Sequence, residues 1–175
     1  ILTSENDKEV TLRQQTKTAY DDEVLDSLTG LYNETYFGTR LQEELHRSSS
    51  TEGMLGLVRI DFKGMDGLRS YYGQASVDDL LLDVSEFLKE NVRRIDVVCR
   101  VGDHGFAVIL CCTALSAQIV AHRMIVRFND WASELRAPMG PVKCLLGAAT
   151  YPANGQSVKA LFNEATPTEA GFKAV

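Results

Sequence analysis

The sequence predicts an α+β domain in which helices pack on a mainly antiparallel sheet, and three observations support this class. Segments with strand and helix patterns follow one another between residues 54 and 151 in the order β-α-β-β-α-β. A short turn with glycine at both ends separates the second and third strands, which predicts a hairpin. Both helices of the series are apolar on one side only. This order is the split βαβ, or ferredoxin-like, arrangement, which many unrelated proteins share, so it gives no function.

The first half of the chain contains two helices and one strand by these patterns. Asn33 is placed to cap a helix with one apolar face. That face consists of Phe37, Leu41 and Leu45. Residues 54–62 are rich in Leu, Val and Ile, which predicts a strand. Ser76, followed three residues later by Asp79, resembles a capping box at the start of the next helix. The apolar face of that helix consists of Leu80, Leu81, Val84, Phe87 and Leu88.

The second half supplies the hairpin, a long helix, a strand and a last helix. The strands of the hairpin are residues 96–101 and 106–112, around the turn at 102–105. Ser116 is placed to cap the long helix. Its inward side includes Val120, Ala121, Met124, Ile125 and Phe128. A strand follows at 142–151 and a helix at 157–165, and Pro167 argues against a simple continuation of this helix.

Composition limits the class of protein and of partner. The chain has 175 residues, of which 45% are hydrophobic and 24% charged, as in an ordinary globular domain. We expect a connecting helix or tail at 1–25 and one domain at 26–175. The net charge of −6 argues against nucleic acid as a partner, and the lack of an apolar run of about 20 residues argues against membrane insertion by this segment. The four cysteines form no CxxC pair, so we expect free thiols in a reducing compartment and no metal site.

Four segments of the chain form a recognisable pattern. The first two are Asp26-Ser-Leu-Thr-Gly-Leu-Tyr-Asn33 and the strand ending at Asp61, followed by Tyr72-Gly73 and Val77-Asp78. The others are Arg93-Arg-Ile-Asp96, with the turn Gly102-Asp103-His104-Gly105-Phe106 after a gap of five residues, and the strand at 142–151 with the helix behind it. Together they resemble the GGDEF family of diguanylate cyclase domains over about residues 22–165.

The resemblance implies a palm-type, nucleotide-cyclase-like sheet, which agrees with the order of elements. Active members of the family join two GTP molecules into cyclic di-GMP, and each domain of a dimer holds one GTP with two metal ions. Their signature hairpin, GGDEF or GGEEF, supplies a metal-binding carboxylate and a second acidic group used in catalysis. By this resemblance the chain is part of a bacterial, cytoplasmic signalling protein.

The hairpin of this chain departs from the family at both acidic positions. His104 stands where the metal-binding Asp or Glu is expected, and Gly105 stands at the catalytic Glu. Phosphoryl transfer needs metal ions to neutralise the developing charge, and Mg²⁺ needs oxygen ligands. By the resemblance, Asp61, Asp78 and His104 mark a vestigial nucleotide and metal pocket. We expect no catalytic residues, no bound metal and no cofactor.

Neighbouring family positions have also changed. The family's second strand carboxylate falls on Lys63, its phosphate-binding Lys on Asp66, and its guanine-reading Asn on Arg69. Asp66 would repel a triphosphate. Asp61 can also be interpreted as a carboxylate facing water, and Asp78 as an acidic residue that complements a helix dipole.

The motif Arg93-x-x-Asp96 matches the inhibitory site of the family, including the gap to the hairpin. In active members this RxxD site binds cyclic di-GMP. Arg93 can bind phosphate or a guanine edge, Asp96 can accept from guanine N–H groups, and Arg123 resembles the family's secondary arginine. Arg94, Arg100 and Arg127 could add positive charge. A plain alternative is a solvent-exposed ion pair between Arg93 and Asp96.

Three functions follow as hypotheses. The first is a catalytically inactive domain of cyclic di-GMP signalling that binds cyclic di-GMP through Arg93, Asp96 and Arg123. The second is a ligand-free module that forms a homodimer or relays a signal between an upstream sensor and a downstream effector domain. The third is an active cyclase with unusual ligands. In each case we expect the domain to be cytoplasmic, either by itself or as the cytoplasmic part of a larger, membrane-associated protein.

Overall fold

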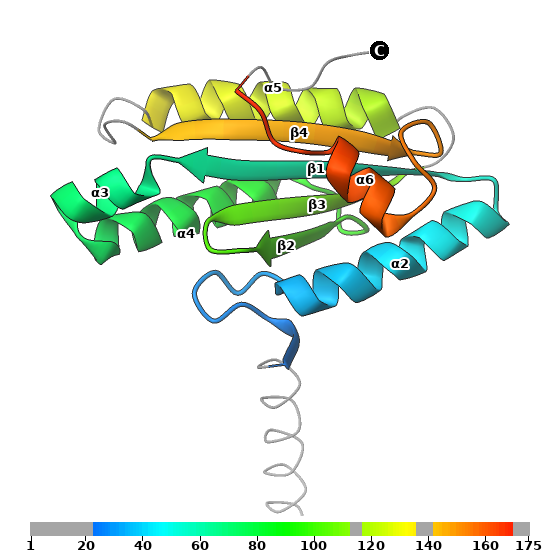
Figure 1. Cartoon of the computed structure of the whole chain (residues 1–175), viewed down its shortest axis with the longest axis horizontal. Coiled ribbons are helices and arrows are strands. Elements are labelled where there is room, and N and C mark those ends of the chain that lie inside the picture. Colours follow the sequence, from blue (N-terminus) through cyan, green and yellow to red (C-terminus); the bar gives the residue numbers. More distant parts are fainter. Residues whose placement is uncertain (1–22, 113–116, 136–141, 170–175) are drawn as a thin grey trace, which may run out of the picture.

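The computed structural model describes residues 23–112, 117–135 and 142–169 (Figure 1). Its helices are α2 (Glu34–Ser50), α3 (Met65–Tyr72), α4 (Gln74–Asn91), α5 (Ala117–Leu135) and α6 (Val158–Glu164). Its strands are β1 (Met54–Lys63), β2 (Val97–Val101), β3 (Gly105–Cys112) and β4 (Lys143–Tyr151). Most of the helix or tail expected at 1–25, and the expected cap at Ser116, lie outside the described residues.

The four strands form one antiparallel sheet in the order β2-β3-β1-β4. β1 lies inside the sheet, where Val58 stands opposite Val108 on β3 and Ala148 on β4. The series β1-α4-β2-β3-α5-β4 confirms the predicted βαββαβ order. The hairpin is confirmed as well, with Val101 opposite Gly105 at its closed end.

The sheet is covered on both faces, because its strands alternate apolar side chains between two layers (Figure 1). Val58 and Ile60 of β1 join a buried cluster with α3, α4 and α5. Leu55 and Leu57 of the same strand join a second cluster with α2 and α6. This period of two is what a strand buried on both sides requires.

The helix starts agree with the sequence in two cases and differ in a third. The Asn33 side chain caps α2 by accepting from Tyr36 N (3.0 Å), as predicted, and Ser157 caps α6. The capping box predicted at Ser76 is wrong. α4 already begins at Gln74 after Gly73 (φ 87°), and the Ser76 hydroxyl donates to the carbonyl oxygen of Tyr72 (3.2 Å), the last residue of α3.

Helix α3 was not predicted by the sequence patterns. It has eight residues and starts after Gly64 (φ 88°), without a side-chain cap. Only Met65 and Leu68 are buried in it, which is too few for a periodic signal.

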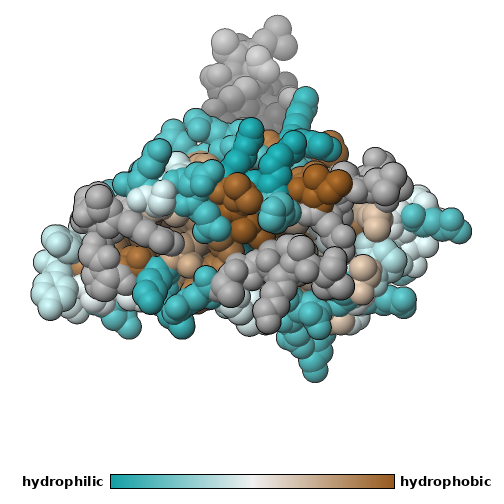
Figure 2. All heavy atoms as spheres, turned by 90° about the horizontal axis from the view of Figure 1, so that it is seen from above, coloured by the Kyte–Doolittle hydropathy of each residue, from teal (hydrophilic) through white to brown (hydrophobic). Residues whose placement is uncertain are grey.

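Short backbone bridges flank both edges of the sheet. Tyr32 pairs with Cys99 on β2, and Thr168 pairs with Leu146 on β4. The surface on the α5 side is mostly hydrophilic with small hydrophobic patches (Figure 2), and α5 exposes Ile119 and Val126. Among the described residues, no helix combines the length and the apolar character needed to span a membrane.

Candidate functional site

The turn between α4 and β2 holds Asp96 in a fixed orientation. One carboxylate oxygen accepts from Arg93 N and the other from Cys111 N, both at 3.0 Å. The pairing of β2 with β3 begins at Val97, which stands opposite Ile109. Cys111 lies beyond this pairing, and its backbone N–H is satisfied by the Asp96 side chain instead of by a strand. The alternative of an ion pair between Arg93 and Asp96 is not realised among the described residues, because Asp96 contacts the Arg93 backbone instead. Each carboxylate oxygen can still accept another hydrogen bond.

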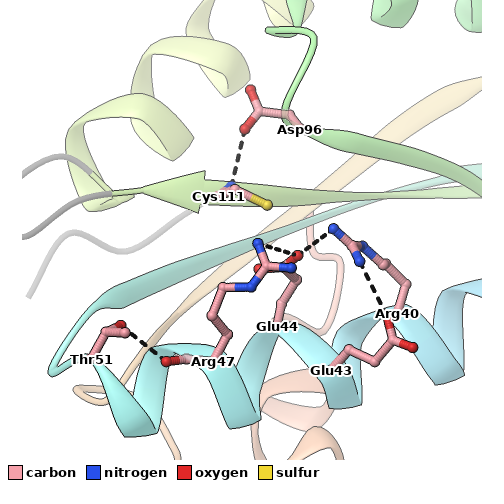
Figure 3. A network of polar contacts seen from close by, with 7 residues as sticks. All are labelled: Arg40, Glu43, Glu44, Arg47, Thr51, Asp96 and Cys111. Carbon is pink, nitrogen blue, oxygen red and sulfur yellow. Dashed lines mark hydrogen bonds and ion pairs between the residues drawn. The ribbon is translucent and has the colours of Figure 1, made fainter.

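Cys111 connects this turn to α2 (Figure 3). Its sulfur points toward Glu44, a carboxylate only 3% exposed that lies between Arg40 (2.5 Å) and Arg47 (3.4 Å). Burial raises the pKa of the Cys111 thiol to about 12, and the Glu44 and Asp96 carboxylates act in the same direction. The thiol therefore stays neutral near pH 7 and is a packing group rather than a nucleophile.

Arg93, Asp96 and Arg123 come together as the sequence predicted. All three line one small hollow between the α4–β2 turn and α5. Within the described residues, the guanidinium groups of Arg93, Arg94 and Arg123 have no hydrogen-bonding or ion-pair partner. Arg127 lines the same hollow and donates to Asn91 Oδ1 (3.4 Å). An acidic protein thus presents a local cluster of unpaired positive charge, which suits an anionic ligand.

Arg100 does not belong to this cluster, contrary to expectation. It is 7% exposed and donates to the carbonyl oxygens of Gly105 (3.0 Å) and Asp103, so it holds the hairpin turn from inside. Burial lowers its pKa, against the opposing effect of nearby carboxylates that include Asp26. Gly102 (φ 63°) donates its N–H to a Glu34 carboxylate oxygen (3.0 Å), which fastens the outside of the turn to α2.

Arg69, which the resemblance places at a guanine-reading position, reaches across to the hairpin. One of its terminal nitrogens lies 3.2 Å from His104 Nε2 and the other 3.2 Å from Asp66 Oδ1. Its Nε donates to Gln74 Oε1 (2.8 Å), and the Gln74 amide in turn donates to Asp78 Oδ1 (2.7 Å). The structure therefore joins two predicted vestigial residues, His104 and Asp78, through Arg69 and Gln74.

The third vestigial residue, Asp61, lies apart from that network on β1. Its carboxylate accepts from the backbone N–H of Phe62 (2.8 Å). Lys63 pairs with Glu169 (3.4 Å), which also pairs with Lys143 (3.6 Å). The part of the chain that the structure describes contains no group of three or more His, Cys, Asp or Glu side chains placed to hold a metal ion.

Sequence reasoning missed the roles of Arg69, Glu34 and Cys111. Arg69 was noted only for the residue it replaces, and its contacts depend on α3, which the sequence did not predict. The Glu34 and Cys111 contacts join residues 68 and 15 positions apart, and no local pattern signals such pairs.

Comparisons with known proteins agree with this geometry. A family model described as "Diguanylate cyclase, GGDEF domain" matches residues 23–168. Diguanylate cyclase DgcS of Shewanella oneidensis is 28% identical over 126 residues, which are 72% of this chain and 42% of that protein. The chain therefore spans less than half the length of this relative.

Solved structures resemble the chain as well. The GGDEF domain of PA1120 (TpbB or YfiN) from Pseudomonas aeruginosa superposes with a TM-score of 0.67 and 26% identity, covering 81% of this chain and 83% of that one. The coiled coil and GGDEF domain of DgcB from Caulobacter crescentus, solved in complex with c-di-GMP, has a TM-score of 0.74 and 18% identity, covering 94% of this chain and 87% of that one. This second likeness concerns the fold alone.

Proposed function

Because the chain belongs to the GGDEF family of diguanylate cyclase domains, we propose that it acts in cyclic di-GMP signalling as a catalytically inactive receptor domain. Its ligand is cyclic di-GMP, bound by Arg93, Asp96 and Arg123. As a receptor for an intracellular messenger, the domain works in the cytoplasm.

The observation that carries the proposal is the unpaired charge beside a fixed carboxylate. Arg93 and Arg123 have no partner within the described residues, so a phosphate or a guanine edge does not have to displace one. Asp96 is held by two backbone N–H groups and keeps lone pairs for guanine N–H donors. Hydrogen bonds in which one partner is ionised are about twice as strong as neutral ones, so the carboxylate suits guanine N–H donors and the arginines suit phosphate oxygens.

The absence of cyclase activity is supported by the chemistry of the hairpin. His104 and Gly105 offer no carboxylate for Mg²⁺, and Lys63 adds positive charge beside Asp61. Arg69 ties His104, Asp66 and Gln74 together where a guanine base would enter. A GTP molecule would have to displace these contacts without gaining a second metal-binding carboxylate.

Calorimetric titration with cyclic di-GMP tests the receptor function. We expect saturable binding that Arg93→Ala abolishes and Lys159→Ala leaves unchanged. Lys159 is an exposed lysine on α6, so its variant matches the loss of one positive charge at a distant place. No heat from folded protein would contradict the proposal and leave a ligand-free dimerisation or relay module.

Incubation with GTP tests the proposed inactivity separately. We expect no cyclic di-GMP with either Mg²⁺ or Mn²⁺ after incubation at high protein concentration. Formation of product, measured by chromatography and dependent on Asp61, would overturn this part of the proposal and make the chain an active cyclase.

A further inference from the structure

A second, larger hollow lies beside Arg93 and is distinct from the one that contains Arg123. This groove has a volume of about 520 Å³ and runs between the N-terminal turn, residues 25–32, and the α4–β2 turn. Arg93 and Asp96 line both hollows, whereas Arg94 and Lys89 line the groove alone. Its volume lies within the range of small-molecule sites.

The wall formed by the N-terminal turn is an ordered structure held by its own hydrogen bonds. Asp26 N donates to Leu31 O (2.7 Å), and Gly30 N donates to Asp26 O (2.8 Å). The Asp26 carboxylate accepts from both the N–H and the hydroxyl of Thr29 (2.9 and 2.7 Å). Arg100 N donates to Tyr32 O (2.7 Å), which fastens this wall to β2. A ligand in the groove would therefore meet a preformed surface.

The groove combines an apolar floor with a basic rim. Its floor is provided by Leu25, Leu31, Tyr32, Val92 and Val98. Lys89, Arg93 and Arg94 supply three positive charges, and Asp96 is the one carboxylate among the residues that line the groove. Both Asp96 oxygens already accept from backbone N–H groups, and Lys89 donates to Thr29 O (2.8 Å). Arg94 has no partner within the described residues and is free to meet an anion.

We propose that this groove receives one purine nucleotide unit of the cyclic dinucleotide bound at Arg93. The flat base lies on the apolar floor, and the phosphate faces Arg93 and Arg94. This inference rests on the proposed receptor function and adds the N-terminal turn to its binding site. The ligand then contacts both the α4–β2 turn and the N-terminal turn, through which the chain enters the domain. Binding therefore makes the N-terminal turn more rigid.

Arg94→Ala separates this proposal from binding through Arg93, Asp96 and Arg123 alone, because Arg94 does not line the hollow with Arg123. Its side chain is exposed and makes no contact that folding needs. In a calorimetric titration with cyclic di-GMP we expect its Kd to rise about ten- to a hundredfold, as for the loss of a hydrogen bond to a charged group. Lys159→Ala is the charge-matched control and keeps the wild-type Kd.

Amide hydrogen exchange gives a second readout. Ligand is expected to slow the exchange of the Gly30 and Leu31 amides in the N-terminal turn. If the wild type binds and Arg93→Ala does not, an unchanged Kd in Arg94→Ala with unchanged exchange at 25–32 overturns the groove proposal. If the wild-type protein itself binds no cyclic di-GMP, the receptor function fails and the groove proposal fails with it.

Discussion

A side chain at position 105 is expected to destabilise the hairpin, and the size of the effect follows from the backbone. A Cβ added to Gly105 would lie 2.7 Å from Val101 O and 3.3 Å from Ile60 O, whereas real Cβ contacts essentially never fall below 3.0 Å. Both neighbours are backbone atoms of strands that pair with β3, so neither can turn aside. Overpacking of this kind costs about 1–3 kcal/mol, and a domain of this size loses about 2–4 °C of Tm per kcal/mol.

We therefore expect Gly105→Ala to lower the Tm by about 2–12 °C in a calorimetric or circular-dichroism melt. Gly105→Glu should lower the Tm by at least as much and give no cyclase activity. Gly38→Ala is the control, because nothing lies within 4 Å of its Cβ and alanine favours the helix by up to about 1 kcal/mol. A Gly105→Ala protein as stable as the wild type would refute this account of the hairpin. Cyclase activity in Gly105→Glu would contradict our expectation that a single restored carboxylate is not enough for catalysis.

Three further predictions concern the fold and the thiols. Asn33→Ala removes the cap of α2 and should cost about 1 kcal/mol in urea unfolding, whereas Asn33→Asp should cost much less. Phe128→Ala empties the centre of an aromatic cluster with Phe87 and Trp131 and should lower the free energy of unfolding by about 3–5 kcal/mol. The fluorescence emission of the single tryptophan should change as well. A loss under about 1 kcal/mol would contradict the packing. Because burial raises the pKa of Cys111 to about 12, its thiol should resist alkylation by iodoacetamide at pH 8 in the native protein and react in denaturant, as peptide mass mapping can show. Above this pKa the thiolate forms and the reaction accelerates. Fast labelling of the native protein at pH 8 would contradict the burial of the thiol.

The sequence predicts the main elements because their apolar periods differ clearly. β1 alternates its apolar side chains between two layers, α4 repeats them every three to four residues, and these periods decide element type. The predictions failed at the start of one helix and for one short helix. α3 is too short to show a period, and Gly73 lets α4 begin before the serine that was expected to cap it.

The candidate site was predictable only in part, because the sequence gives the spacing of residues but not the direction of their side chains. The sequence predicted that Arg93, Asp96 and Arg123 belong to one site, and in the structure all three line one hollow. The direction of a side chain was not predictable where it depends on register and turn geometry. Arg100 turns inward to hold the hairpin, and Asp96 bonds backbone rather than the Arg93 side chain.

The two short bridges that flank the sheet also cover parts of its edge strands that could otherwise pair with another chain. β2 and β4 are the edge strands, and edge strands with free N–H and C=O groups invite pairing with other chains. Tyr32 occupies part of one edge at Cys99, and Thr168 exchanges two hydrogen bonds with Leu146 at the other (3.0 and 3.2 Å). The segments before α2 and after α6 thus shield opposite borders of the sheet. Truncation after Glu164 would remove Thr168 and leave the backbone N–H and C=O of Leu146 without these partners, so we expect this edge of β4 to be open to pairing with another chain.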